Sequence, residues 1–489
     1  MVAAGDPRSA QVGAGVLRAG GNAVDAAIAS VMASWVCEPL LTGPGAGGYM
    51  LVAGAGREPV LLDFFVAAPG AGGPAGERAP LVPFEVSFGD TVQLFNCGAA
   101  SAGVPGLPAG LDHAARRWGS LPLSELGAPA AKMAREGVPL NFEQAYVFEI
   151  LVGMIASTPE ALAAFARNGV PLRAGDPFSS PEMARTIERL GEEGSAPFYR
   201  GEVAEAIVRQ VQEGGGTLGA QDLASYEAIE RAPARATYCG LEVLTNPPPS
   251  AGGILLALAF ELLESDGDGP PSTRRLVEVM EQVQELRTPQ FTEQLAQEGF
   301  LERFLAANLG STTHTSVIDA DGLACSVTCT NGEGSGLVVP GTGIHLNNIM
   351  GEEDLSPSGF FAAPAGLRMP SMMAPTVVSG AGGEVLLAVG SAGSNRIRSA
   401  ILQVVVNALA RGMAAEAAVV APRVHVEGGT LFAEPGVDLD GLGREDLEIV
   451  RFRAENLFFG GAQLVERDPA TGGCRGAGDP RRGGAAVAA

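Results

Sequence analysis

The stretch Thr312–Thr330 reads TTHTSVIDADGLACSVTCT and contains two runs in which polar and apolar residues alternate. Between the runs lies DADG, at 319–322, whose aspartates and glycine suit a tight reversal of the chain. The pattern therefore predicts a β-hairpin. Folding the chain about this turn brings Thr330, at the far end of the second strand, opposite Thr312 or within one register step of it.

Two interpretations of Thr312 are compatible with this hairpin. In the first, threonine is simply a residue that favours strands, and His314 is a polar residue on an exposed face. In the second, Thr312 is a nucleophile that self-cleavage exposes as the first residue of a new chain. Its α-amine, with an ordinary pKa of about 8, then accepts the hydroxyl proton, as in other N-terminal threonine nucleophiles. A Ser-His-Asp triad lacks support, because no G-x-S-x-G elbow accompanies the four histidines.

The segments outside the hairpin predict helices around sheets. Strands continue to about Leu346, a loop rich in proline and glycine runs to Pro375, and VLLAVGSAGSNRIRSAILQVVVNALARG reads as strand, turn and helix. Before the hairpin, 9–36, 111–211 and 272–308 carry apolar residues at the three- and four-residue intervals of helices. We expect helices outside, sheets inside and a change of composition near position 310.

A glycine-rich segment has the spacing of a dinucleotide-binding loop, but the residues after it do not fit such a site. Gly43, Gly45 and Gly48 match the spacing G-x-G-x-x-G. The next segment, YMLVAG, reads as a strand, whereas the phosphate loop needs a helix whose N-terminus faces the pyrophosphate. We therefore expect no nucleotide cofactor.

Composition excludes other classes of function. The chain of 489 residues has a formal charge of −23, so a surface that follows nucleic-acid phosphates is not expected. The N-terminus lacks the basic start and apolar core of a signal peptide, and no apolar run reaches the roughly 18 residues of a membrane helix. The six cysteines indicate neither a disulfide framework nor a zinc site. We expect a soluble, cytoplasmic protein without nucleic-acid or membrane partners.

Several blocks resemble the gamma-glutamyltransferase family of N-terminal-nucleophile hydrolases. The hairpin and the subsequent GSGLVVPGTGIHLNN resemble the start of that family's small subunit, and GGNAVDAAIA, GPGAGGYMLV, PPPSAGGILLA and GSAGSNRI resemble other family blocks in the same order. The resemblance extends over essentially the whole chain. It implies an α/β fold, a four-layer αββα sandwich, made as one precursor that cleaves itself between Ser311 and Thr312. Regions 1–311 and 312–489 would become a large and a small fragment that intertwine as one folded unit.

The resemblance also implies catalytic roles. Thr312 would be the nucleophile, and Thr330 the neighbouring hydroxyl that orients and polarises it. The backbone amides of Gly393 and Ser394 would form the oxyanion hole, at a turn where the family typically has two glycines; such donors each stabilise the transition state by roughly 3–4 kcal/mol. Thr313 and His314 would continue the strand and support the new N-terminus rather than act as acid or base.

The implied substrate pocket departs from the family pattern at its charged positions. Members that use glutathione typically place an arginine where this chain has Phe65. Losing that guanidinium removes a strong, oriented contact to the donor's α-carboxylate. Glu352 stands where the family has an aspartate that binds the donor's α-amine, and Asn331 is a match for the family's asparagine after the hairpin.

Three further positions make the implied pocket more apolar. Ser371 is retained from a serine pair, but the second member is Met372, and Ile349 replaces a glutamine. The loop before Arg368 is also shorter than in members with a lid. The sequence therefore predicts a more open, more apolar, arginine-free pocket.

Three functions are compatible with these features. The first is a gamma-glutamyl hydrolase or transferase that works through a threonyl acyl-enzyme, with a small-molecule donor and water, an amino acid or a peptide as acceptor. The second is a glutaryl or cephalosporin-type acylase of the same family. The third is a processed but catalytically weak homologue with a structural or binding role. None of them needs a metal or a cofactor.

Overall fold

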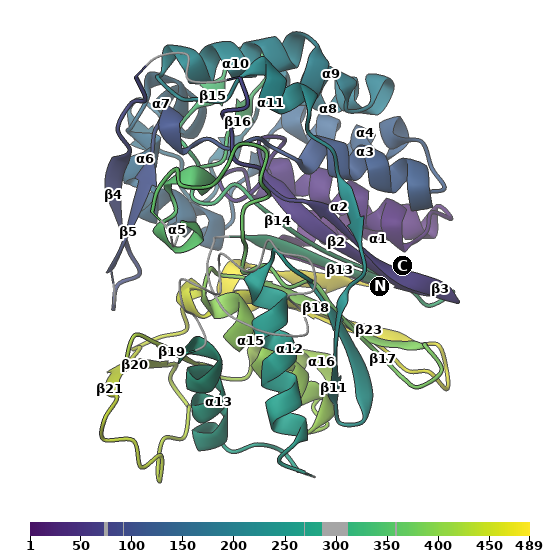
Figure 1. The fold of residues 1–489 in the computed structure, drawn as a ribbon. Coiled ribbons are helices and arrows are strands. Elements are labelled where there is room, and N and C mark those ends of the chain that lie inside the picture. The colour runs from purple at the N-terminus through teal and green to yellow at the C-terminus, as the bar shows by residue number, and fades with distance from the viewer. Residues whose placement is uncertain (73–76, 91, 268, 286–311, 357–358) are drawn as a thin grey trace.

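The computed structural model describes residues 1–489 apart from 73–76, 91, 268, 286–311 and 357–358. Within these limits the chain combines helices and sheets, with two large sheets at the centre and helices outside them (Figure 1). The expected arrangement of helices around sheets is confirmed. No helix of the described part is long and apolar enough to cross a membrane.

The predicted hairpin lies inside an antiparallel sheet with the strand order β10-β3-β2-β14-β13-β1-β24. Its strands come from both sides of position 311. Their bounds are β1 (Val2–Ala4), β2 (Gly47–Gly54), β3 (Arg57–Phe64), β10 (Ile229–Arg231), β13 (Thr313–Ile318), β14 (Leu323–Thr330) and β24 (Ala485–Val487).

A second sheet has the strand order β11-β12-β17-β18-β22-β23 and is also antiparallel. Its bounds are β11 (Ala234–Tyr238), β12 (Leu241–Thr245), β17 (Thr376–Ser379), β18 (Val385–Ala392), β22 (Gly461–Arg467) and β23 (Cys474–Gly478). Strands β18 and β22 contact β13 and β14 face to face.

The two faces of the hairpin sheet belong to different apolar cores, because successive side chains of a strand point to opposite faces. Met50 and Val52 of β2 join the core that includes α1 and α2. Tyr49 and Leu51 of the same strand join the core shared with β18, β22 and α15. The hairpin is thus buried on both sides, between the helices and the second sheet.

Helices cover the outer faces of both sheets (Figure 1). Contacting the hairpin sheet are α1 (Pro7–Arg18) and α2 (Ala23–Cys37), and the second sheet is covered by α12 (Ala251–Glu264), α15 (Arg396–Leu409) and α16 (Ala415–Val420), with α13 (Thr273–Glu285) beside α12. The remaining helices gather at one end of the molecule: α3 (Leu107–Trp118), α4 (Leu123–Glu136), α5 (Phe142–Ile150), α6 (Val152–Ile155), α7 (Pro159–Phe165), α8 (Pro181–Glu193), α9 (Ala196–Arg200), α10 (Glu202–Glu213) and α11 (Ala220–Ala224).

Short strands and 3₁₀ turns complete the described chain. The strands are β4 (Val82–Ser87), β5 (Val92–Cys97), β6 (Val138–Pro139), β7 (Ala166–Arg167), β8 (Val170–Pro171), β9 (Pro177–Phe178), β15 (Val338–Val339), β16 (Ile344–His345), β19 (Val424–Glu427), β20 (Thr430–Ala433) and β21 (Glu448–Arg451). The 3₁₀ turns are η1 (Ala99–Ser101), η3 (Ile349–Gly351), η4 (Glu353–Leu355), η5 (Leu457–Phe459) and η6 (Pro480–Arg482).

The local predictions have clear outcomes. The glycine-rich segment runs into strand β2, so the predicted strand after these glycines is confirmed. The helical segment near the N-terminus divides into α1 and α2, and a capping box between Asn22 and Asp25 starts α2. Of the helices predicted over 272–308, α13 ends at Glu285 and the rest lies outside the described residues.

Candidate active site

The hairpin register places Thr312 opposite Thr330. Strands β13 and β14 pair Thr313 with Cys329, so one further step along the same register joins Thr312 and Thr330. Both threonines are buried, with exposed fractions of 0% and 1%. The predicted juxtaposition of the two hydroxyl-bearing residues is therefore present.

The same row continues onto strand β2. Thr330 pairs with Gly47 of β2, and β3 ends at Phe64, opposite Gly48. The main chain of Phe65 then crosses over Gly47, because a Cβ on Gly47 would lie 3.0 Å from the Phe65 Cα. Residues opposite one another point to the same face, so Thr312 and Thr330 both face the second sheet, and Phe65 belongs to the core on that side. With strands about 4.8 Å apart, Gly47 lies about 10 Å from Thr312 along the row.

The turn after β14 brings Glu352 to this row. The Thr330 hydroxyl accepts a hydrogen bond from the Gly332 amide at 2.7 Å, which orients it. Gly332 has a φ of +61°, and a Cβ there would overlap the Glu352 carboxylate. Glu352, 4% exposed, therefore lies against the turn that comes after Thr330. Asn331 is buried in the same turn, and its Oδ1 has no hydrogen-bond partner within the described chain.

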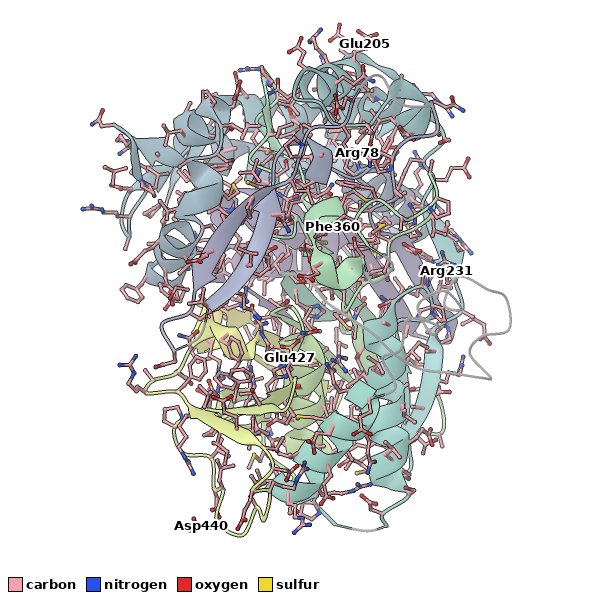
Figure 2. All side chains as sticks on the ribbon, turned by 60° about the vertical axis from the view of Figure 1, so that its left-hand side comes forward. Arg78, Glu205, Arg231, Phe360, Glu427 and Asp440 are labelled. Carbon is pink, nitrogen blue, oxygen red and sulfur yellow. The ribbon has the colours of Figure 1, made fainter. Side chains whose placement is uncertain are left out.

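The loop after Glu352 reaches the surface. Figure 2 shows Phe360, from this loop, between the two ends of the molecule, and its exposed fraction is 38%. Arg78 lies over the ring of Phe361 beside it, at 4.0 Å. Glu352 is thus a buried carboxylate at the inner end of a loop whose outer end contacts solvent.

Strand β18 carries the predicted oxyanion turn toward the same end of the sheet. The Ser326 hydroxyl donates to the Val389 carbonyl at 3.1 Å, and the His314 ring fills the space above Gly390. On the hairpin, the row of Ser326 is followed by the row of His314, and the next row in that direction contains Thr312. On β18, the corresponding move from Val389 to Gly390 leads toward residue 393. The turn at 393–395 therefore comes after β18 at the end of the sheet that bears Thr312.

The backbone of this turn has the form of an anion-binding nest. Gly393 has a φ of +119° and Ser394 a φ of +61°, and α15 begins immediately after Asn395. Successive amides in such a turn, at the N-terminus of a helix, point toward a common centre that suits negative charge. The geometry is consistent with the oxyanion hole that the sequence predicts.

Ser394 stands in a left-handed conformation that favours glycine, which gives a prediction. Replacing Ser394 with glycine keeps the backbone amide and relieves strain, so the free energy of unfolding should rise by about 1 kcal/mol. The rate constant of amide hydrolysis should stay within about twofold of the unmodified protein. Urea unfolding and steady-state kinetics check both, with Ser394→Ala as the control that keeps the strain. A large loss of rate in both variants would assign the chemistry to the hydroxyl instead.

Phe65 and two neighbours form an apolar surface beside the row. Phe65 is fully buried and stacks on Tyr49, with ring centroids 5.5 Å apart. Ile349 and Met372 are buried in the same apolar core. The expected apolar surroundings are present, and Thr312, Thr330, Phe65 and Glu352 are all buried.

Arg368 lies beside Phe65, and its guanidinium makes structural contacts with β3 and Tyr226. Its guanidinium donates to the Phe65 carbonyl at 3.1 Å, pairs with Asp63 at 3.3 Å and lies over the ring of Tyr226. The segment around Arg368 therefore holds the end of β3 in place. Its cation is already paired and does not replace the family arginine.

Ser371 is near this surface but is held by its own loop. The Met369 amide donates to the Val66 carbonyl at 2.9 Å, which ties the loop to the residue after Phe65. The Ser371 hydroxyl accepts from the Met373 amide at 3.0 Å, and the Ser371 carbonyl accepts from the Gly252 amide. The structure thus places Ser371 at the Phe65 end of the row, whereas Asn331 and Glu352 lie at the Thr330 end.

His314 is buried in the contact between the two sheets. Burial lowers its pKa to about 3, and its ring nitrogens contact the hydroxyls of Thr328 at 2.8 Å and Ser316 at 2.9 Å. The imidazole is therefore neutral and part of the contact between the sheets. The interpretation of His314 as an exposed polar residue is wrong, because β18 covers that face.

Three buried polar groups near the row were not predicted. The Tyr49 hydroxyl and the side-chain amide of Asn395 have no hydrogen-bond partner among the residues described. Glu38 accepts a hydrogen bond from the Thr313 hydroxyl at 2.9 Å. Only Glu38 had a signal in the sequence, as a lone charge within the apolar run WVCEPLL.

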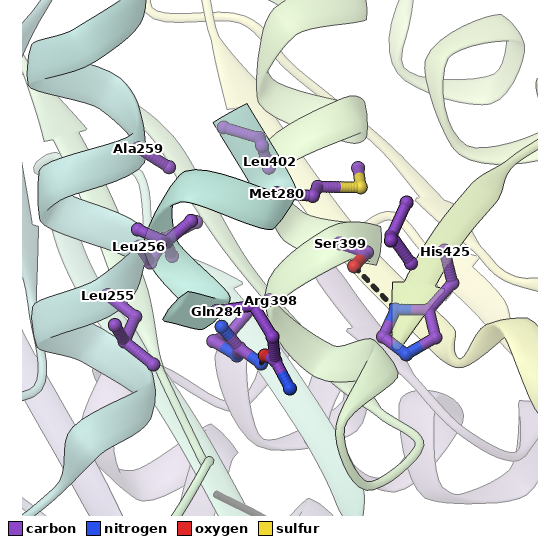
Figure 3. Close-up of a pocket in the computed structure, with 11 residues that line it drawn as sticks. Leu255, Leu256, Ala259, Met280, Gln284, Arg398, Ser399, Leu402 and His425 are labelled. Atoms are coloured by element: carbon purple, nitrogen blue, oxygen red, sulfur yellow. Dashed lines mark hydrogen bonds between the residues drawn. The ribbon is translucent and has the colours of Figure 1, made fainter. Parts of the chain in front are cut away.

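A crevice between α12, α13 and α15 does not compete as a substrate site. Figure 3 shows Leu255, Leu256 and Met280 around Arg398, with a hydrogen bond joining Ser399 to His425. Its cavity volume is about 10 Å³, which is about the room that one water molecule needs. In the described chain, no group of three or more His, Cys, Asp or Glu side chains is placed to hold a metal ion.

Comparisons with known proteins give consistent relatives. A family model described as gamma-glutamyltranspeptidase matches residues 9–308 and 272–489. The chain is 32% identical over 505 residues to a glutathione hydrolase proenzyme of Pseudomonas aeruginosa, covering 93% of this chain and 88% of that protein. It is 30% identical over 472 residues to the acylase ACY 1 proenzyme of Pseudomonas sp. strain SE83, covering 89% and 84%. The solved cephalosporin acylase of Bacillus halodurans is 27% identical, with a TM-score of 0.84, and the match covers 100% of this chain and 95% of that structure.

Proposed function

Because the chain belongs to the gamma-glutamyltranspeptidase family, we propose that it is a self-processing amidohydrolase that cleaves or transfers a gamma-glutamyl group through Thr312. The observation that carries this proposal is the pairing of Thr312 with Thr330, with the turn at Gly393 at the same end of the facing sheet. The pairing supports the proposal because it sets a second hydroxyl opposite the proposed nucleophile on one buried face.

Self-processing creates the nucleophile. The Thr312 hydroxyl oxygen attacks the carbonyl carbon of residue 311, the C–N bond breaks, and an ester joins the two residues. Water hydrolyses the ester and leaves a carboxylate on residue 311 and an α-amine on Thr312. Residue 311 itself lies outside the described residues, so the proposal is supported by the position of Thr312 and by the proenzyme names of the relatives.

The two fragments, 1–311 and 312–489, would remain associated. Strands β13 and β14 of the second fragment pair with β1 and β2 of the first, and β12 of the first pairs with β17 of the second. Separating them would expose both apolar cores. These interleaved strands, with α1 and α2 outside one sheet and α12 and α15 outside the other, support a four-layer αββα sandwich.

Turnover uses the same atoms. The α-amine takes the Thr312 hydroxyl proton while the oxygen attacks the donor's γ-amide carbonyl, and the Gly393 and Ser394 amides stabilise the oxyanion. The C–N bond then breaks, and the leaving amine takes the proton from the α-ammonium. Water, an amino acid or a peptide attacks the acyl-enzyme and loses a proton to the α-amine, and the hydroxyl of Thr312 is restored.

Donor recognition would involve Glu352 and position 65 together, because the α-ammonium and the α-carboxylate of a glutamyl donor are on the same carbon. Glu352 lies beside the Thr330 turn and suits the α-ammonium of a glutamyl donor. Phe65 offers no charge to the donor's α-carboxylate. That difference, together with the acylase relative, favours as a second candidate an acylase that removes a glutaryl or related acyl group.

Two chromogenic amides separate these candidates. Gamma-glutamyl-p-nitroanilide and glutaryl-p-nitroanilide differ in the α-ammonium that Glu352 is proposed to bind. We expect the gamma-glutamyl compound to be hydrolysed at least about tenfold faster, which is about 1.4 kcal/mol of transition-state binding. Glu352→Gln should remove most of this preference while the glutaryl rate changes little.

Other results of this comparison identify the alternatives. Equal rates with the unmodified protein would remove Glu352 from the role, and a faster glutaryl rate would favour the acylase. A chain that is cut but hydrolyses neither compound would support the catalytically weak homologue.

A further inference from the structure

A buried carboxyl lies behind the nucleophile and has no part in the turnover of the gamma-glutamyl donor described for Thr312. Glu38 comes directly after α2 and is 2% exposed. Its Oε1 accepts a hydrogen bond from the Thr313 hydroxyl at 2.9 Å, and its Oε2 has no hydrogen-bond partner in the described chain. Any role of Glu38 in catalysis rests on the proposed function, in which Thr312 becomes an N-terminal nucleophile.

The position of Glu38 is unfavourable for a carboxylate. Burial first and the nearby Asp6 second raise its pKa to about 8, and Thr313, Arg482 and Arg8 offset only part of the rise. The C-terminal end of α2 also presents partial negative charge to the carboxyl. An acid held in so costly a place, beside reacting groups, is a candidate for a functional role.

Glu38 reaches the main chain next to the cleavage point. Thr313 faces α2, on the side of the sheet opposite to the Thr312 side chain. Since neighbouring Cα atoms are about 3.8 Å apart, the Glu38 carboxyl lies roughly 7 Å from the Thr312 nitrogen. That nitrogen is an uncharged amide in the precursor and an ammonium after the cut. A buried ammonium is costly unless an anion faces it.

The other titratable groups near Glu38 come from four parts of the chain: the start of α1, η6, α2 and β14. Asp6, before α1, is already bonded to Arg8 by both carboxylate oxygens. Arg482, in η6, has a pKa lowered to about 10 by burial first and by Arg396 second, while Glu38, Asp479 and Glu333 raise it. The thiols of Cys37 and Cys329 have raised pKa values because of burial and are neutral. Among these groups, Glu38 is the acid that accepts a hydrogen bond from Thr313 and also has an oxygen without a hydrogen-bond partner in the described chain.

We propose that Glu38 is a positioning residue that faces the α-ammonium group of Thr312 once the chain is cut and sets the protonation state of that amine. Because the amine must be neutral to take the Thr312 hydroxyl proton, Glu38 then determines the pH above which the enzyme is active. Thr313 acts with it, by holding the carboxyl in place behind the strand.

The pH dependence of kcat/KM tests this role with gamma-glutamyl-p-nitroanilide and the processed protein. A carboxylate raises the pKa of a nearby amine, so Glu38→Gln should lower the pKa of the Thr312 α-amine. With the two groups about 7 Å apart, the acid limb of the kcat/KM profile should move to lower pH by about one unit or more. Glu38→Asp keeps the charge and should leave the limb within about 0.3 units of its original position.

A second variant guards against failure of the first to fold. Thr313→Val keeps the shape and strand preference of the side chain but removes the bond to Glu38, and it should move the acid limb in the same direction as Glu38→Gln. The inference is overturned if kcat/KM falls equally at every pH, or does not change, in the variants that fold. If the unmodified chain is neither cut nor active, the proposed function fails instead; a cut and active protein with an unmoved limb rejects only the role of Glu38.

Discussion

Replacing Thr312 with alanine is expected to leave the chain uncut and to abolish amide hydrolysis. The hydroxyl oxygen is the attacking atom in both reactions, and the neighbouring Thr313 hydroxyl lies on the opposite face of the sheet, where it donates to Glu38. Removing a catalytic nucleophile lowers kcat by at least about 10⁴-fold in well-studied hydrolases. Denaturing electrophoresis should show one band for Thr312→Ala and two for the unmodified protein, and p-nitroaniline release measures the loss of rate.

Two matched variants make this result specific to the hydroxyl of Thr312. Thr312→Ser keeps a hydroxyl and should be cut, although more slowly, because serine fixes its rotamer less strongly than a β-branched residue. Thr315→Val changes a buried threonine on the opposite face of the same strand, and it should be cut normally. If Thr312→Ala yields the same two bands as the unmodified protein, another residue makes the cut and the proposed mechanism is wrong.

Thr330 was placed opposite Thr312 from the sequence because that relation is local. The turn at Asp319–Gly322 and the alternation of β13 and β14 determine one register, and a slip by one residue would turn every apolar side chain to the wrong face. The rejection of a dinucleotide loop was local for the same reason, since it depended only on the strand residues directly after Gly48.

Phe65 was recognised as a departure from the family but not as the end of a row. Its place depends on pairing β14 with β2 and β2 with β3, and the first of these joins strands separated by most of the chain. No periodicity within either segment contains that information. The family resemblance supplied the role of the position, and the sheet register supplied the distance from Thr312 to Gly47, over which Phe65 lies.

The burial of Glu38 and His314 could not be predicted from the sequence. Both are charged or ionisable residues that a sequence alone would place at a surface. Their burial results from α2 packing on one face of β13 and from β18 packing on the other. The Thr313–Glu38 bond joins residues 275 positions apart. Such contacts arise from the tertiary fold, so they became visible only in the structure.

A guanidinium at position 65 is expected to restore selection for the donor's α-carboxylate. We expect the unmodified protein to hydrolyse gamma-glutamyl- and 4-aminobutanoyl-p-nitroanilide at similar rates. These amides differ only in that carboxylate, and Phe65 cannot distinguish it. In Phe65→Arg the gamma-glutamyl compound should be favoured by about tenfold to a hundredfold, or about 1.4–2.7 kcal/mol, because a bidentate guanidinium–carboxylate contact forms at the transition state as well as in the complex.

The geometry supports this gain in spite of the buried position. The main chain of Phe65 lies over Gly47, which is about 10 Å from Thr312 along the row. An extended arginine side chain and a glutamyl group can together cover that distance. Asp63 is already paired with Arg368 and Arg231, so it would not neutralise the new cation. The new guanidinium is therefore left to the substrate.

The cost of burying the new charge must be separated from its effect on selectivity. Phe65→Met removes the stack on Tyr49 without adding charge, and Phe65→Lys adds charge without the planar fork of arginine. If a bidentate contact gives the preference for the gamma-glutamyl compound, this preference should decrease in the order Arg, Lys, Met. The free energy of unfolding, measured in urea, need not follow the same order. A Phe65→Arg protein that folds, is cut and still treats both amides alike would mean that the donor does not lie along the row. The pocket would then have to be sought on another side of Thr312.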